Sequence, residues 1–333
     1  GLGTITISSF GSNGDAFIKL NGTDYVTFDG IDMEDLFTGV VTLGKVEYGF
    51  MLCRASATDG CKNITIRNCR IVMALNSVTS VSAGIYTASY TSAGVSTSAT
   101  SIGGRHENIF IDGNTIERTV TGMYFNGTTD AVAPYNLYDN NIQVGATTGN
   151  TIIAGSRTST NTVTQYGIYA IYGDSVKFNN NTIRMFTGTN LATHYGIFTS
   201  TGTNSNIDII GNTVSDSTNV AGSSQQIGIG NTFGASGTNN TVNILNNNVS
   251  NCVHNFATVP TVSYIQNSAG AFTINITGNT VSNNTVGAGT STSTGTITGI
   301  LQSTGNTTVG ATLTVSNNTV NGLTRSQSAA GTG

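Results

Sequence analysis

The sequence predicts an all-β solenoid of about nine coils, tied together by an internal asparagine ladder. A nine-residue unit recurs along the 333 residues, and its copies are separated by a variable 26 to 45 residues. No segment shows the capped periodicity that is typical of a helix. Because the unit is constant while its spacing varies, the pattern favours stacked strands that are joined by loops of different length.

The unit has apolar residues at positions 2, 4 and 9, and the alternation of positions 2 and 4 indicates a strand with one buried face. Position 6 holds only Gly, Asn or Asp. These residues tolerate a positive φ, so we expect the strand to end there in a sharp bend. The clear copies are "NIFIDGNTI" (108–116), "PYNLYDNNI" (134–142), "SVKFNNNTI" (175–183), "NIDIIGNTV" (206–214), "TVNILNNNV" (241–249), "TINITGNTV" (273–281) and "TLTVSNNTV" (312–320), and the weaker ones are "YVTFDGIDM" (25–33) and "NITIRNCRI" (63–71).

Position 7 is asparagine in every clear copy, although strand interiors normally disfavour this residue. If successive units lie one strand spacing apart, roughly 4.8 Å, the carboxamides can hydrogen-bond along the stack. We therefore predict that these side chains tie each coil to the next. The predicted ladder consists of Asn114, Asn140, Asn181, Asn212, Asn247, Asn279 and Asn318.

Each coil is expected to contain further strands. Between the units a Gly followed by large apolar residues recurs, as in "GIY" (84–86 and 167–169) and "GIF" (196–198), and another apolar run begins at position 9. We expect residues 1–333 to form one domain. The chain begins "GLGTITISSF", without an initiator Met or a signal peptide, which predicts a segment of a longer secreted protein.

These repeats resemble the right-handed parallel β-helix of the pectate-lyase-like superfamily. The resemblance covers residues 1–325 and rests on the repeated apolar-x-apolar-x-Gly/Asn-Asn pattern. It implies a right-handed parallel β-helix. It does not select one function, because the superfamily includes polysaccharide lyases and hydrolases, phage tailspikes, adhesins and structural stalks.

Composition excludes two classes of partner. Charged residues make up only 8% of the chain, the net charge is −4, and the 12 Lys and Arg residues are scattered. A nucleic-acid-binding surface would need clustered basic residues, so we expect no nucleic-acid partner. No apolar run approaches the roughly 20 residues that cross a bilayer, so we expect no membrane insertion.

The four cysteines allow one structural hypothesis. Cys53 and Cys61 flank the turn-like segment "RASATDG", where a disulfide is possible in an oxidising compartment. Cys69 occupies a unit position that is elsewhere Asn, which indicates a small buried residue. Cys252 and His254 lack further metal-ligand partners in the sequence, so we expect no metal site there.

The outward positions of the unit do not predict a catalytic residue. Carbohydrate-cleaving enzymes need paired carboxylates near one sugar, and positions 3 and 5 never place two carboxylates on neighbouring coils. Asp29, Arg67 and Asp112 suggest an alternating ion ladder instead. The acidic segment "DGIDMED" offers Asp29, Asp32, Glu34 and Asp35 as a weak calcium candidate, although its spacing is not that of an EF-hand. We expect no other cofactor.

Two long segments, 87–107 and 144–165, are rich in Ser, Thr and Gly, which fits either sugar binding or a spacer. The tyrosines in "YTASY" and "YGIYAIYG" fit either sugar stacking or a structural ladder. The sequence as a whole favours a non-catalytic extracellular structural or adhesive module, such as a bacterial surface stalk or filament. The alternatives are a polysaccharide-degrading enzyme or tailspike and, third, a carbohydrate-binding module.

Partners follow from the predicted architecture. The ends of a β-helix expose unpaired strand edges, so flanking segments of the same polypeptide or identical subunits are expected to cover them. Cell-surface glycans are a further candidate partner, and the expected location is extracellular, on a bacterial cell surface.

Overall fold

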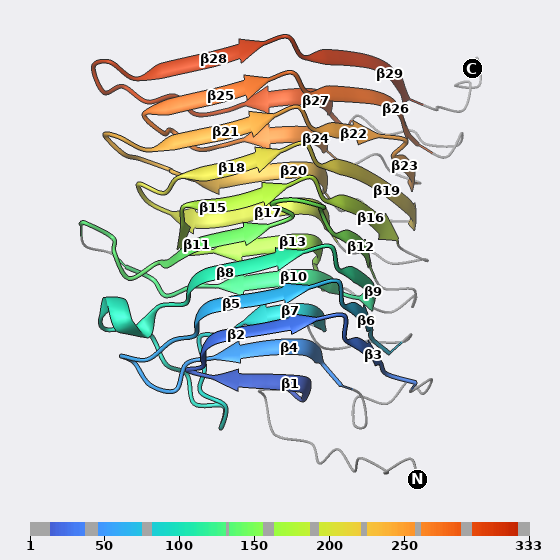
Figure 1. Cartoon of the computed structure of the whole chain (residues 1–333). Coiled ribbons are helices and arrows are strands. Elements are labelled where there is room, and N and C mark those ends of the chain that lie inside the picture. The colour runs from blue at the N-terminus through green and yellow to red at the C-terminus, as the bar shows by residue number, and fades with distance from the viewer. Residues whose placement is uncertain are drawn as a thin grey trace, which may run out of the picture.

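The protein is described by a computed structural model, which covers residues 14–36, 46–74, 82–130, 133–155, 163–186, 193–220, 225–256, 261–287 and 295–325. Within these ranges the chain forms strands and a single 3₁₀ turn, η1 (Ile102–Gly104). The strands wind into a solenoid in which three parallel sheets run along the long axis (Figure 1). The predicted all-β parallel β-helix is therefore confirmed.

Each coil contributes one strand to each sheet, in the order first, second, third. The first sheet consists of β1 (Ala16–Asn21), β4 (Tyr48–Cys53), β7 (Ala83–Thr87), β10 (Thr121–Asn126), β13 (Gln165–Ile171), β17 (His194–Gly202), β20 (Gln226–Phe233), β24 (Val262–Asn267) and β27 (Ile297–Gln302). The second sheet consists of β2 (Asp24–Asp29), β5 (Lys62–Arg67), β8 (Glu107–Asp112), β11 (Asp139–Val144), β15 (Val176–Asn179), β18 (Ile207–Ile210), β21 (Thr241–Leu245), β25 (Thr273–Thr277) and β28 (Thr312–Ser316), and β14 (Gly173–Asp174) pairs with β11 beside this path.

The third sheet carries the strands that begin after the bend. It consists of β3 (Asp32–Glu34), β6 (Arg70–Val72), β9 (Thr115–Thr119), β12 (Thr151–Ala154), β16 (Thr182–Phe186), β19 (Thr213–Val220), β22 (Asn248–Ser250), β23 (Val253–Phe256), β26 (Thr280–Val286) and β29 (Thr319–Arg325).

The nine units correspond to nine different strands of the second sheet, and the first sheet likewise contains nine strands. The solenoid that they form has about seven turns, against the nine coils predicted.

The inward side chains of the second sheet form apolar columns in strict register. Ile64 pairs with Ile109, which pairs with Ile142, and all three are fully buried. Burying such a side chain contributes roughly 1.5–3 kcal/mol, so the column supplies a continuous core along the axis. The period-two pattern that predicted this face is confirmed.

The bends have the backbone conformation that the sequence predicts. All position 6 residues except Asp139 have positive φ values, between 54° and 71°. Gly or Asn is needed here because other side chains clash in the left-handed region. These residues are Gly30, Asn68, Gly113, Asn180, Gly211, Asn246, Gly278 and Asn317.

The asparagine ladder forms at the same bends, inside the solenoid. Asn181 illustrates the pattern: its Nδ2 donates to the carbonyl oxygen of Val144 at 3.1 Å and to Asn212 Oδ1 at 3.0 Å, and its backbone N–H donates to the same Oδ1 at 3.0 Å. Each carboxamide from Asn114 to Asn279 therefore has both of its N–H groups and its oxygen satisfied, which buried polar groups require. The members in chain order are Asn114, Asn150, Asn181, Asn212, Asn247, Asn279 and Asn318.

One member of the predicted ladder is wrong. Asn140 lies at the beginning of β11, and its Nδ2 donates to Glu107 Oε1 at 3.2 Å. The fourth coil uses Asn150, because "PYNLYD" precedes the strand and the loop 145–149 is inserted before the bend. Gly149, with φ of 82°, occupies the bend position that the sequence assigned to Asp139.

A second polar ladder, which the sequence did not lead us to predict, lies in the first sheet. Asn231 Nδ2 donates to Asn267 Oδ1 at 2.7 Å, and Asn267 Nδ2 donates to Gln302 Oε1 at 2.8 Å. Thr199 begins the series by donating to Asn231 Oδ1. The signal was present in the sequence: Thr199, Asn231 and Gln302 each lie three residues after the recurrent Gly of the first sheet. In the C-terminal coils, hydrogen bonds between amide side chains thus connect successive coils at the ends of the first-sheet strands as well as at the ends of the second-sheet strands.

The two neighbouring asparagines Asn150 and Asn140 allow a matched test of the ladder. Asn150→Ala leaves the buried donors of Asn114 without their acceptor, and each unsatisfied buried group costs about 1–3 kcal/mol. We expect a loss of about 3 kcal/mol or more in the free energy of unfolding, measured by chemical denaturation. Asn140→Ala should cost less than about 1 kcal/mol, because it removes one hydrogen bond outside the ladder. Equal losses in the two variants would contradict the assignment.

Candidate functional site

The outward face of the second sheet carries the positions at which paired catalytic carboxylates would lie. The position 3 column consists of Thr27, Thr65, Phe110, Gln143, Lys177, Asp208, Asn243, Asn275 and Thr314. Along this column of described strands, no two carboxylates are neighbours. Asp208 accepts a hydrogen bond from Asn243, and Asn243 accepts one from Asn275, each at 2.8 Å. These side chains are therefore engaged with one another.

The predicted ion ladder has two members and not three. Arg67 lies 2.8 Å from Asp29 Oδ2, and both side chains are largely exposed. Asp112 instead accepts hydrogen bonds from the backbone N–H groups of Thr147, Thr148 and Gly149. The Asp112 carboxylate therefore holds the inserted loop of the fourth coil in place.

The acidic side chains of the calcium candidate have separate partners. Asp29 binds Arg67 and Asn68, Glu34 forms ion pairs with Arg70 and Arg118, and Asp35 accepts the backbone N–H of Val46. The carboxylate of Asp32 stands on β3 with Glu34. In the described ranges, no group of three or more His, Cys, Asp or Glu side chains could hold a metal ion. The calcium candidate is therefore not assembled as a ligand set.

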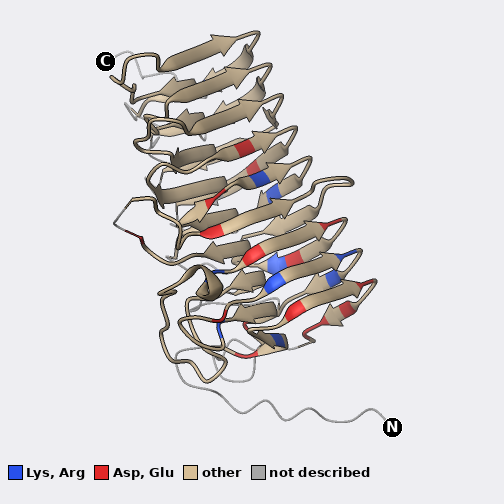
Figure 2. Cartoon of the chain, turned by 60° about the vertical axis from the view of Figure 1, so that its left-hand side comes forward, with Lys and Arg blue, Asp and Glu red and all other residues tan. Residues whose placement is uncertain are grey.

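Ionisable residues are concentrated in the N-terminal coils, and the C-terminal coils are almost without them (Figure 2). A buried polar network lies in this charged half, around Arg54. Its side chain is fully buried and forms an ion pair with Asp139 at 2.8 Å. Arg54 Nε donates to the Gly104 carbonyl oxygen, and one Nη donates to the Ala88 carbonyl oxygen, each at 2.9 Å.

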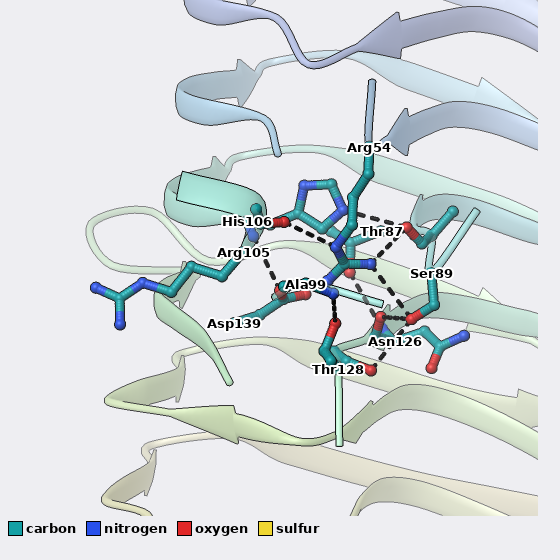
Figure 3. A network of polar contacts seen from close by, with 12 residues as sticks. Arg54, Thr87, Ser89, Ala99, Arg105, His106, Asn126, Thr128 and Asp139 are labelled. Atoms are coloured by element: carbon teal, nitrogen blue, oxygen red, sulfur yellow. Dashed lines mark hydrogen bonds and ion pairs between the residues drawn. The ribbon is translucent and has the colours of Figure 1, made fainter. Parts of the chain in front are cut away.

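The same network fixes the long segment 87–107 against the solenoid (Figure 3). Asp139 Oδ1 also accepts the backbone N–H of His106, and His106 Nδ1 accepts that of Cys61. The backbone N–H of Ala99 donates to Thr128 Oγ1 at 2.9 Å. This segment is therefore a packed part of the fold, held by residues that the sequence places as far as 85 positions apart.

Burial governs the electrostatics of this network. It raises the pKa of the Asp139 carboxyl to about 6, against the opposing effect of the Arg54 guanidinium. Burial, together with the same guanidinium, holds the pKa of His106 well below its usual range. The imidazole is neutral at pH 7, with one ring nitrogen accepting from Cys61 and the other facing the Ala88 carbonyl oxygen. Arg54, Asp139 and His106 all contact backbone groups of the loops, which indicates a role in holding these loops.

Removing Arg54 should be far more damaging than removing an exposed arginine. Arg54→Ala leaves Asp139 buried without its counter-charge, which costs about 3–5 kcal/mol. We expect that loss in chemical denaturation, with faster proteolytic cleavage between residues 88 and 104. Arg67→Ala is the control, since its exposed pair is screened by solvent and should leave the midpoint unchanged. A similar midpoint for the two variants would contradict the role assigned to Arg54.

A second buried cluster joins the first and third sheets. His194 Nδ1 lies 3.3 Å from Asp216 Oδ1, and His254 Nδ1 lies 3.8 Å from Asp216 Oδ2. Thr218 Oγ1 is 3.3 Å from His254 Nδ1. All three ionisable side chains are more than nine-tenths buried. An arrangement of His and Asp can transfer protons, but these groups lie in the interior, where they pair with one another.

This cluster predicts a loss of stability in acid. Burial lowers the pKa of His254 from 6.5, with His194 acting in the same direction and Asp216 against it. The unfolded chain therefore binds the proton more readily, and stability falls as the pH drops below about 6.5. One imidazole contributes at most about 1.4 kcal/mol at pH 5.5, one unit below its ordinary pKa.

The test compares the free energy of unfolding at pH 7.5 and 5.5 in the wild type and in His254→Gln. We expect the variant to lose less stability on acidification, because its side chain does not titrate. His106 adds a loss of the same sign, and Asp139, whose pKa is raised, opposes it. The comparison between the two proteins isolates His254, and an identical pH dependence would contradict the assignment.

The predicted disulfide does not form in this structure, where the four cysteines are free thiols. Cys61 packs in the inner core, whereas Cys53 belongs to a separate cluster with Met51 and Tyr86. Cys61 Sγ instead donates to the Cys53 carbonyl oxygen at 3.3 Å. Burial raises the pKa of Cys53 to about 11 and that of Cys61 to about 12, so both thiols are protonated at neutral pH.

Four of the tyrosines, among them Tyr86 and Tyr169 of the two tyrosine segments, form a structural stack on the outer face of the first sheet. The rings of Tyr48, Tyr86, Tyr124 and Tyr169 follow one another at centroid distances of 4.8, 5.1 and 4.8 Å with interplanar angles of 20–24°. Their faces are therefore covered by one another, which is incompatible with stacking on sugar rings. Such pairs contribute about 0.5–1.5 kcal/mol beyond burial.

Comparisons with models of protein families, with curated proteins and with solved structures found no match to this chain. The structure confirms the parallel β-helix, and membership of the superfamily stays a prediction. No helix in the described part of the chain is long and apolar enough to cross a membrane. The second long segment, 144–165, contains the loop held by Asp112 and strand β12, and its residues 156–162 lie outside the described ranges.

Proposed function

We propose that this chain is a non-catalytic structural or adhesive module outside the cell, such as part of a bacterial surface stalk or filament. The observation that carries the proposal is the lengthwise bonding of successive coils. The asparagine ladder runs from Asn114 to Asn318, and three parallel sheets run beside it. Pulling along the axis would load these hydrogen bonds across many coils at once, as a stalk requires.

The surface chemistry supports the same proposal. Outward side chains bind their neighbours on the next coil, as in the series Asp208, Asn243 and Asn275. The rival function, cleavage of polysaccharides, needs two carboxylates that face one sugar. The described outward columns of the second sheet offer no such pair, so the geometry favours the structural module.

The C-terminal end suggests how such a module would be extended. Leu313, Val315 and Val320 take inward positions, yet about half of each side chain is exposed, since β28 and β29 are the last strands of the described ranges. A further coil that carried Asn in the ladder position could accept from Asn318. The first coil has Ile31 in that position, which cannot accept. A flanking coil of different sequence therefore fits this end better than the first coil of an identical subunit.

The first test is electron microscopy of the producing cells after labelling with an antibody to this chain. We expect label along extended surface structures. The same purified chain should release neither reducing sugar nor unsaturated uronic-acid products from a panel of neutral and acidic polysaccharides. Label confined to free secreted particles would contradict the stalk, and release of either product would favour the rival enzyme.

A further inference from the structure

An open cavity of about 380 Å³ lies on the side of the solenoid where the chain passes from the first sheet to the second. Its lining comes from four connecting segments: 133–138, 203–206, 234–240 and 303–311. This volume is at the lower end of the range of about 300–1,000 Å³ that small-molecule sites occupy. None of the sequence motifs pointed to it.

The cavity is held open by hydrogen bonds that reach across more than one coil. Tyr138 Oη accepts the backbone N–H of Thr203 at 3.2 Å, and Asn306 Nδ2 donates to the Gly237 carbonyl oxygen at 3.0 Å. These partners are 65 and 69 residues apart, about twice the spacing of neighbouring ladder members. The segments 133–138 and 303–311 therefore extend toward the segments 203–206 and 234–240, and the space between these segments is part of the fold.

All of the residues that line the cavity are uncharged. Thr203, Ser236, Thr238 and Thr308 contribute hydroxyl groups, each able to donate and to accept. The hydroxyl of Thr203 contacts the Tyr138 hydroxyl, whereas those of Ser236, Thr238 and Thr308 are available to a ligand. A charged ligand would find no counter-ion here, whereas a neutral polyhydroxylated ligand matches the lining.

Tyr135 adds an aromatic ring at the same cavity. It is half-buried and has a φ of 58°, a conformation that bulky residues rarely adopt. Its ring stacks on Tyr138 at 6.1 Å, and the Tyr138 hydroxyl donates to the Asp130 carbonyl oxygen. The ring is thus held in place before a ligand arrives. Unlike the rings of the outer stack, Tyr135 combines an apolar surface with free hydroxyl groups nearby, and the C–H groups of a sugar are attracted to such a ring face.

We propose that this cavity binds a terminal neutral sugar of a glycan. The proposal deepens the adhesive side of the proposed function, on which it rests for the extracellular source of the ligand. Tyr135 supplies the apolar contact, and the hydroxyls of Ser236, Thr238 and Thr308 take the hydrogen bonds to the sugar hydroxyls.

The experiment is a saturation-transfer NMR titration of the purified chain with methyl glycosides of glucose, galactose, mannose and N-acetylglucosamine, and with galacturonic acid. We expect at least one neutral glycoside to bind with a Kd of about 1–10 mM, and the galactoside to bind at least as tightly as galacturonic acid. Tyr135→Ala should weaken binding about tenfold or more. Thr238→Val, which preserves shape and removes one hydroxyl, should weaken it about three- to tenfold.

Tyr25→Ala is the matched control, because this tyrosine is 82% exposed and lies on β2, far from the cavity, so binding should be unchanged. If Tyr135→Ala lowers the melting temperature, the binding measured for Thr238→Val decides whether the cavity is the sugar site. The proposal is overturned by no binding of any neutral glycoside up to about 50 mM, by binding that survives both variants, or by a preference for galacturonic acid. Failure here would leave the labelling of surface structures intact, and failed labelling would leave sugar binding intact, so the two outcomes are distinguishable.

Discussion

The buried carboxamide of the ladder asparagine is the interaction on which the solenoid depends. A polar side chain in the interior is tolerated only when its donors and acceptor are all satisfied, and a primary amide can meet this condition by bonding to its own copy one coil away. Asn212 does so with Asn181 on one side and Asn247 on the other. The requirement fixes the distance between coils, the register of the sheets and the position of each bend together.

Once the bends are fixed, loop length is free to vary, and the loops differ in length from one coil to another. In the fourth coil the inserted loop 145–149 is held by Asp112. Segment 87–107 is larger and is held by a buried arginine, which donates to its backbone carbonyl groups at Ala88 and Gly104. Buried charge therefore appears where the solenoid departs from its simple repeat, and its cost is offset by the carbonyl groups that it satisfies.

The difference between the repeated strands and the variable loops also separates structural surfaces from surfaces that are available for binding. Sheet faces are occupied by side chains that contact the next coil, whether amides at Asn243 and Asn275 or rings at Tyr86 and Tyr124. Such faces gain stability by mutual contact and leave little for a ligand. The segments that connect the first sheet to the second lack this repeated pairing, and Tyr135 and the nearby hydroxyls lie there. The proposed sugar site thus lies on connecting segments, which do not have to match from coil to coil.

Sequence alone determined the strand of each unit, the bend and most of the ladder, because these are local patterns: alternation such as Val242 and Ile244, and a Gly or Asn where φ is positive. It chose Asn140 over Asn150, since the dipeptides Asp139-Asn140 and Gly149-Asn150 lie ten residues apart and only the pairing of β11 with β8 shows which of them is aligned with the ladder.

The tertiary structure alone decided the Arg54–Asp139 pair, the second amide ladder, the separation of Cys53 from Cys61 and the cavity beside Tyr135. Each of these depends on which residues the stacking of coils brings together, across loops of unequal length. A repeat unit records what one coil must do to stack on the next, but it carries no information about contacts between the segments that differ.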